Sequence, residues 1–299
     1  MLDYAALAAL AAVASEGSFE RAAQCLHVTP SAVSQRVRLL EERMGCALVV
    51  RAQPCRPTET GRRLCHHLDR VRLLEQELQQ ALPGLSPAGG ALRVRLPVAV
   101  NADSLATWFA PMLAEFAADA PVLVDLSVDD QDHTGEWLRS GAVLAAVTAS
   151  GRPFAGCHSH PLGAMRYRAA ASPAFLARHF ADGASAASLA SAPCLVFNAK
   201  DELQDRWALR LTQAPVDLPK HHVPSPQAFV TAALAGMGWG LQPEALVSEH
   251  LRAGRLVELL PGAVLDVPLY WQHARAASGL LEAFSRRVVS AAGAALVMG

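Results

Sequence analysis

Residues 18–45 read SFERAAQCLHVTPSAVSQRVRLLEERMG, and this stretch decides the fold of the first part of the chain. It predicts two short helices joined by a tight turn at residues 27–28. Ser18 and Thr29 are residue types that cap helix N-termini, and Pro30 suits the first helical position because it lacks an N–H group. Gly45 provides a left-handed stop. Apolar residues fall at helical spacing on one face of each helix, namely Phe19, Ala22, Ala23 and Leu26 on the first and Val33, Val37, Leu40 and Met44 on the second, where they are expected to be buried.

The opposite face of the second helix is polar near its start. A recognition helix in the major groove of DNA needs hydrogen-bonding side chains for base edges and positive charge for phosphates at this place. The alternative is the solvated face of an ordinary helical hairpin, because helix-turn-helix patterns are short. The candidate DNA-binding residues of this helix are Thr29, Ser31, Ser34, Gln35, Arg36 and Arg38.

A wing is predicted directly after this helix. Residues 47–51 form a short apolar strand, and residues 53–57 form a turn with two prolines. In a winged helix-turn-helix domain, Arg51 and Arg56 would reach phosphates or the minor groove. The alternative is a surface hairpin whose arginines are merely solvated.

A long helix follows, capped by Thr58 and extending over residues 59–82. A long helix with one narrow apolar stripe needs a partner helix, and a homodimer supplies one. The alternative is packing on the chain's own C-terminal part. The stripe consists of Leu64, Leu68, Val71, Leu74, Leu78 and Leu82.

Length and composition set outer limits. The 299 residues suffice for about two domains, and the composition, with 52% hydrophobic and 18% charged residues, is globular. The net charge is −1, so the DNA prediction depends on local placement and not on bulk charge. The six cysteines show no C-x-x-C spacing, and residues 2–15 predict a helix without the basic start of a signal peptide. We therefore expect a cytoplasmic protein with no membrane partner.

Strands alternate with helices beyond a Pro- and Gly-rich linker at residues 83–90. Strands are predicted at residues 92–98, 122–128, 142–147, 195–197 and 238–242, and the last helix from residue 279 onward. This order predicts an α/β fold with a parallel sheet in each of two lobes. Ligands of such folds bind beyond the carboxyl ends of the strands, beside helix N-termini.

Candidate effector-binding residues lie at these strand ends. Backbone N–H groups and the Ser104 hydroxyl suit a carboxylate, and Asn101 or Asp103 suits an α-amino group. Asp129 and Asp130 suit a cationic side chain, because ammonium and guanidinium groups pair with carboxylates. The alternative for each residue is ordinary helix capping. The remaining candidates are Thr148, Ser150, Phe197, Asn198 and Ser225.

Three segments, FERAAQxLxVTPSAVSQRVxxLE from residue 19, LVVR from residue 48 and RPTExG from residue 56, resemble the LysR-type transcriptional regulators. VNADSLATW from residue 100 and LYWxH from residue 269 further resemble the ArgP/LysG subgroup. The resemblance covers the whole chain. It implies an N-terminal all-α winged helix-turn-helix domain at residues 1–58, a dimerisation helix and hinge at 59–90, and a two-lobed effector domain of the type II periplasmic-binding-protein fold at 91–299.

The resemblance also implies the partners. These are double-stranded promoter DNA, a small-molecule effector such as lysine or arginine, and further copies of the chain in a homodimer or homotetramer. The regulated gene would encode an amino-acid exporter or a related protein. The alternatives are a solute-binding protein without a DNA role, an enzyme on an α/β scaffold, and a LysR-type regulator with an effector that is not an amino acid.

Other motifs do not favour catalysis. The G-x-G-x-G pattern at residues 236–240 follows a predicted helix and leads into a strand, which is the reverse of a dinucleotide loop. The histidine pairs at residues 66–67, 158 and 160, and 221–222 lack further ligands at metal spacing. No nucleophile elbow, P-loop or H-E-x-x-H motif occurs. The sequence predicts no catalytic residues, no cofactor and no metal.

Overall fold

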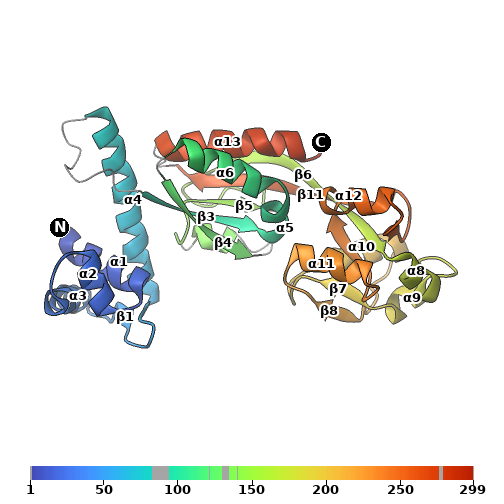
Figure 1. Cartoon of the computed structure of the whole chain (residues 1–299), viewed down its shortest axis with the longest axis horizontal. Coiled ribbons are helices and arrows are strands. Elements are labelled where there is room, and N and C mark those ends of the chain that lie inside the picture. Colours follow the sequence, from blue (N-terminus) through green and yellow to red (C-terminus); the bar gives the residue numbers. More distant parts are fainter. Residues whose placement is uncertain are drawn as a thin grey trace.

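The computed structural model describes residues 2–82, 94–120, 122–129, 135–139, 141–275 and 279–298. Three helices, α1 (Tyr4–Glu16), α2 (Phe19–Cys25) and α3 (Pro30–Met44), pack on one another at the N-terminal end (Figure 1). Their shared core includes Leu10, Ala22, Val33, Val37 and Leu40. Among the described residues, we find no helix with the length and apolar character that crossing a membrane requires.

The predicted caps of these helices are confirmed. The Ser18 hydroxyl accepts the N–H groups of Glu20 and Arg21, and the Thr29 hydroxyl accepts that of Ala32. Gly45 ends α3 with φ of 68°. The prediction that Met44 is buried is wrong, because its exposed fraction is 39%. Met44 is the last residue of α3, and the core contact of this helix ends at Leu40.

The wing is shorter than predicted but present. Strands β1 (Val49–Val50) and β2 (Arg56–Pro57) pair antiparallel. The Glu41 carboxylate of α3 accepts the N–H groups of Leu48 and Val49 at 2.8 and 3.2 Å. The wing is therefore fixed to the helix that carries the candidate DNA-binding residues.

Helix α4 (Glu59–Ala81) starts at Thr58, whose hydroxyl accepts the N–H of Gly61. Leu68 packs in the N-terminal core, whereas Leu73, which lies outside the predicted stripe, packs in the core of the second part of the chain. Leu74, Leu78 and Leu82 have exposed fractions of 53%, 52% and 51%. At Leu73, α4 therefore packs on the chain's own C-terminal part. The exposed Leu74, Leu78 and Leu82 offer an apolar face to a partner helix.

We expect Gly61→Ala to lower the free energy of unfolding by about 1–3 kcal/mol, the usual cost of overpacking. A Cβ at Gly61 would lie 2.1 Å from the carbonyl oxygen of Leu48, so α4 and the wing would have to separate. Gly293→Ala is the matched control, since it lies in helix α13 (Gly279–Ala295) with no atom within 4 Å of the added methyl. Urea denaturation should show the control to be as stable as the parent chain or up to about 1 kcal/mol more stable. Equal stabilities of the two variants would contradict this packing.

The second part of the chain is built on one mixed sheet, with strand order β10-β6-β11-β5-β3-β4 and β9 added to β6. Strand β3 (Val94–Asn101) pairs parallel with β4 (Val122–Asp129) and β5 (Ala145–Thr148). The long strands β6 (Cys157–Ala171) and β11 (Val264–Ala274) pair antiparallel with each other and run between two lobes (Figure 1). Lobe I comprises residues 94–156 and α13, and lobe II comprises residues 172–263.

The expectation of a parallel sheet in each lobe is thus correct only in part. It holds for β3, β4 and β5 and for the small pair β7 (Cys194–Val196) and β8 (Lys220–His222) of lobe II. It is wrong for β6 and β11, and for β9 (Gly240–Pro243) and β10 (Val257–Glu258), which pair antiparallel with β6. The two long strands connect the lobes instead of belonging to one of them.

Helices cover both lobes. In lobe I, α5 (Ala102–Ser104), the π-helical turn η2 (Leu105–Phe109) and α6 (Ala110–Asp119) form one continuous helical segment that packs on α13 through Phe109, Phe116 and Phe284. The short helix α7 (Gly135–Arg139) follows β4. The G-x-G-x-G segment follows the end of α11 and turns at Gly236, with φ of 78°, before β9 begins at Gly240. Lobe II contains α8 (Pro173–His179), α9 (Ala186–Ser191), α10 (Leu203–Thr212), α11 (Pro226–Leu234) and α12 (Glu244–Arg252).

Candidate functional site

The ends of three strands meet at one edge of the lobe I sheet. Asn101 of β3 lies opposite Asp129 of β4 in the pairing register. Val98 and Ala99 lie opposite Ala145 and Ala146, so β5 ends beside them at Thr148. The predicted grouping of these strand ends is therefore present.

Two polar side chains are buried at this edge. Asn101 and Ser104 each have an exposed fraction of 0%. Within the described residues, neither the Asn101 amide nor the Ser104 hydroxyl has a hydrogen-bond partner, and the Asn101 side chain makes no capping bond to α5. Buried polar groups are nearly always paired, often with ordered water, and neither Asn101 nor Ser104 is among the residues that line the cavities described next.

Two neighbouring cavities lie between the lobes, and we name them by one lining residue each. The Gln242 cavity has a volume of about 20 Å³ and is lined by Asp103 of lobe I and by Phe197, Asp201, Leu203, Pro226, Phe229, Leu241, Gln242 and Pro243. The Ser225 cavity, of about 250 Å³, is lined by Ala102, Leu105, Ala106, Val128, Phe197, Pro224, Ser225, Pro226 and Gln227. Phe197 and Pro226 line both. The Gln242 cavity thus has room for about one water molecule, and the Ser225 cavity lies just below the lower range of small-molecule sites.

Three polar side chains, those of Asp103, Asp201 and Gln242, line the Gln242 cavity. The Tyr167 hydroxyl donates to Oδ2 of Asp103 at 2.7 Å. The Asp201 carboxylate accepts the N–H groups of Phe197 and Leu203, and burial raises its pKa against the effect of these hydrogen bonds. Gln242 is 1% exposed, and neither polar atom of its amide has a partner among the described residues. This set of groups suits a ligand that carries both hydrogen-bond donors and acceptors.

The other predicted effector residues divide between the cavities and local structure. Phe197 and Ser225 line the cavities, although the Ser225 hydroxyl also caps α11. The Thr148 hydroxyl accepts the N–H of Ser150, and Oδ1 of Asn198 accepts that of Lys200. These two contacts are local turns and not helix caps, and Thr148, Ser150 and Asn198 are absent from the cavity linings. Asp130 lies outside the described residues.

Three groups are missing from the sequence prediction, namely the cavity-lining residues Asp201 and Gln242, and Tyr167, which bonds to the cavity residue Asp103. Tyr167 lies on β6, a strand that the apolar pattern does not reveal. Asp201 lies in a polar loop that carries no distinguishing pattern. Gln242 offered one signal, since it is the single polar residue in the run GWGLQP at residues 238–243.

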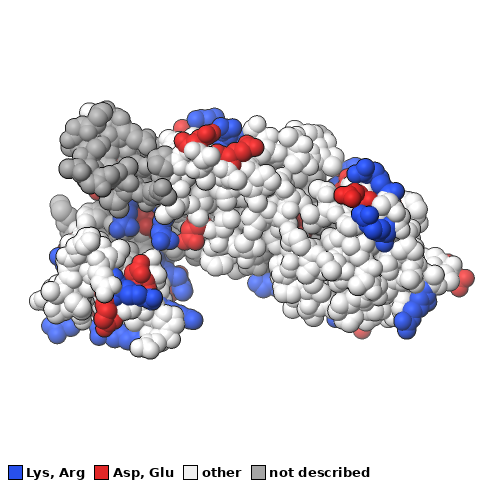
Figure 2. All heavy atoms as spheres, in the orientation of Figure 1, with Lys and Arg blue, Asp and Glu red and all other residues white. Residues whose placement is uncertain are grey.

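The polar face of α3 is open to solvent. Thr29, Ser31, Gln35 and Arg38 are exposed, and Ser34 and Arg36 are partly exposed. Arg38 pairs with Glu42 at 3.2 Å, but both side chains are more than half exposed, so this pair is weak and a phosphate can replace it. Figure 2 shows Lys and Arg side chains along the lower edge of the N-terminal domain.

The wing adds two arginine side chains, those of Arg51 and Arg56, to the N-terminal domain that carries α3. The Arg51 guanidinium lies 5.4 Å from the centroid of the Phe19 ring and 3.8 Å from the Glu41 carboxylate. Arg56 is exposed on the paired strand. An exposed polar helix face beside a cationic hairpin is the arrangement that binds base edges and phosphates of duplex DNA.

Histidines and cysteines form no comparable site in the described part of the chain. Nε2 of His273 lies 3.3 Å from Nε2 of His160, but the described residues contain no group of three ligands arranged for a metal ion. Burial raises the pKa of the Cys65 and Cys194 thiols to about 12, so both are poor nucleophiles.

Comparisons with known proteins agree with this geometry. Residues 4–62 match the family model of the bacterial regulatory helix-turn-helix protein, lysR family, and residues 89–293 match that of the LysR substrate binding domain. The HTH-type transcriptional regulator ArgP of Pseudomonas aeruginosa is 48% identical over 99% of this chain and 98% of its own length.

Two solved structures extend the comparison. ArgP from Mycobacterium tuberculosis is 42% identical with a TM-score of 0.82, and each chain is covered in full. Full-length LysG from Corynebacterium glutamicum with bound effector Arg is 37% identical with a TM-score of 0.70, covering 99% of this chain and 100% of that one.

Proposed function

The chain belongs to the LysR family of DNA-binding transcriptional regulators, and on that premise we propose that its effector is a basic amino acid, arginine or lysine. The observation that carries this proposal is the pair of adjoining cavities between the lobes, where the Asp103 carboxylate and the unpartnered Gln242 amide lie beside the larger Ser225 cavity. The relative with bound arginine supports the choice of ligand class.

Each end of the ligand has a proposed partner. Asp103 binds the α-amino group, and the N-terminus of the helical segment with Asn101 and Ser104 binds the carboxylate. Asp129 and Asp130 pair with the cationic side chain. A ligand that contacts both lobes has different affinities for the open and closed arrangements, which is what a switch requires.

At the other end of the chain, α3 enters the major groove and Arg51 and Arg56 contact the backbone of promoter DNA. We assign residues 1–58 to this domain, 59–90 to a dimerisation helix and hinge, and 91–299 to effector binding. The half-exposed leucines of α4 support a homodimer, and two such dimers would form a homotetramer. We place the protein in the cytoplasm and an amino-acid exporter or a related gene under its control.

A panel of ligands tests the effector. We expect L-arginine or L-lysine to raise the thermal unfolding temperature of the full chain, because a ligand at 100 times its dissociation constant adds about 2.7 kcal/mol of stability. L-glutamate and L-leucine are the matched controls and should cause no shift. A shift with glutamate as large as with arginine and lysine, or no shift with either cation at millimolar concentration, would contradict the proposed ligand class.

A further inference from the structure

A side-chain hydrogen bond joins a cavity-lining residue to one of the strands that connect the lobes. Asp103 lies in the first turn of the helical segment of lobe I and lines the Gln242 cavity. Tyr167 is 1% exposed and lies on β6. Its hydroxyl donates to Oδ2 of Asp103 at 2.7 Å, a distance typical of strong hydrogen bonds to a charged acceptor.

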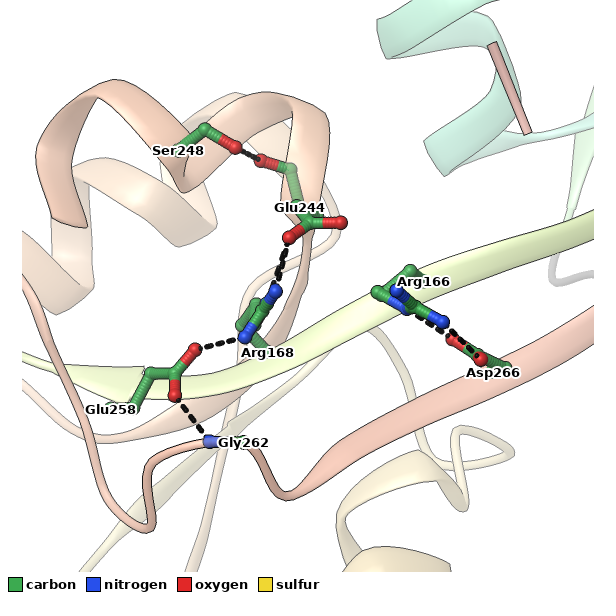
Figure 3. A network of polar contacts seen from close by, with 7 residues as sticks. All are labelled: Arg166, Arg168, Glu244, Ser248, Glu258, Gly262 and Asp266. Carbon is green, nitrogen blue, oxygen red and sulfur yellow. Dashed lines mark hydrogen bonds and ion pairs between the residues drawn. The ribbon is translucent and has the colours of Figure 1, made fainter. Parts of the chain in front are cut away.

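Side chains on both sides of Tyr167 hold β6 in place. Arg166 donates twice to Asp266 of β11, with both distances at 2.8 Å, and these bonds hold the pKa of the Asp266 carboxyl below its usual range. Arg168 bonds to Glu258 of β10 at 2.6 Å and to Glu244, the first residue of α12. Figure 3 shows Arg168 between its two acids and Arg166 across from Asp266.

The backbone register tightens the same segment. Tyr167 lies opposite Leu265 of β11 on one side and opposite Pro243 of β9, a cavity-lining residue, on the other. A phenol on a strand that is paired on both sides and clamped by two arginines is a fixed hydrogen-bond donor. A preorganised donor of this kind sets the orientation of its acceptor before any ligand binds.

From this geometry we propose that Tyr167 is a positioning residue that orients the Asp103 carboxylate for the α-ammonium group of the effector. This inference rests on the proposed function. A carboxylate accepts several hydrogen bonds, so the tyrosine and a ligand ammonium can bind it together. Without the hydroxyl, Asp103 loses the hydrogen bond that orients Oδ2, and the α-amino group of the ligand contributes less to binding.

Calorimetric titration of the full chain with matched ligand pairs tests the proposal. Lysine is compared with 6-aminohexanoic acid, and arginine with 5-guanidinopentanoic acid, since each second compound lacks only the α-amino group. For the unaltered chain we expect the amino acid to bind at least about tenfold tighter than its partner, as a charge-assisted hydrogen bond provides. In Tyr167→Phe this ratio should fall about five- to tenfold, chiefly through weaker binding of the amino acid.

Tyr4→Phe is the control, because it removes a phenol hydroxyl from α1 and should leave the ratio unchanged. Equal weakening of both members of a pair in Tyr167→Phe would indicate a merely structural role and overturn the proposal, as would an unchanged ratio. If the unaltered chain binds neither lysine nor arginine, the proposed function fails and this inference fails with it. If the unaltered chain binds lysine or arginine tightly and both tyrosine variants keep its affinity ratio, the inference about Tyr167 is overturned and the proposed function stands.

Discussion

Asp103→Asn should weaken the binding of arginine or lysine roughly 100-fold, equivalent to about 2.7 kcal/mol, and leave DNA affinity unchanged. The asparagine retains an oxygen that can accept from the Tyr167 hydroxyl, so the contact at 2.7 Å can persist in the variant. What is lost is the negative charge that pairs with the ligand ammonium between the lobes. Calorimetric titration of the full chain measures the change directly.

The control for this variant is Asp119→Asn. Asp119 is the last residue of α6 in the same lobe, and its exposed carboxylate pairs only weakly with Arg287. It should change effector affinity less than about twofold. The role of Asp103 would be contradicted if both variants bound the effector equally well. A loss of thermal stability in Asp103→Asn without any change in ligand affinity would show that Asp103 serves the fold and not the ligand.

Arg38→Ala should produce the opposite pattern, with DNA binding weakened roughly 10- to 100-fold and effector affinity intact. Arg38 is exposed on α3, and its pair with Glu42 at 3.2 Å is too solvated to stabilise the fold by more than about 0.5 kcal/mol. If Arg38 contacts a phosphate, the salt dependence of binding should also decrease by about one counterion. Fluorescence anisotropy with a labelled duplex at several salt concentrations measures both effects.

Arg178→Ala, on α8 of lobe II, removes an exposed arginine of similar character far along the chain and serves as the control. Its DNA affinity should equal that of the unaltered chain. Similar losses in both variants would indicate that general positive charge, and not the face of α3, governs binding. An unchanged affinity in Arg38→Ala would remove this residue from the interface.

The N-terminal helices were predictable because their ends are chemically marked. Ser18, Thr29 and Thr58, the predicted caps, each place a side-chain oxygen on the backbone N–H groups that the helix start leaves unpaired. Asp3 does the same for α1, although it was not predicted as a cap. The helical spacing of Val33, Val37 and Leu40 then fixes the buried face. Met44 shows the limit of such patterns. It continues the apolar spacing of α3, but the core contacts of this helix end at Leu40.

The long strands were not predictable from local pattern. Residues 157–171 read CHSHPLGAMRYRAAA, which mixes histidine, proline, glycine and alanine and carries little of the apolar alternation that marks a strand. Their strand structure comes from pairing with β11, more than 90 residues later at Val264–Ala274. Pairing over such a separation leaves no local trace, and the antiparallel direction of β6 and β11 was missed for the same reason.

The residues of the candidate site likewise divide into some that local sequence pattern predicts and others that it does not. Asp103, Phe197 and Ser225 follow strands directly, so the rule that ligands bind at strand ends placed them at the cavities. Gln242 lines the Gln242 cavity and Tyr167 bonds to Asp103, and both lie on strands of the mixed sheet that only tertiary structure brings beside Asp103. Thr148 and Asn198 satisfied the same rule but are engaged in local backbone contacts.

A footprint on the DNA upstream of the chain's own gene, with and without arginine or lysine, tests the central claim most directly. We predict protection of an interrupted dyad at physiological salt, with an extent that changes when the effector is added. Binding no tighter than to unrelated duplex DNA, or a footprint that neither amino acid alters, would contradict the account.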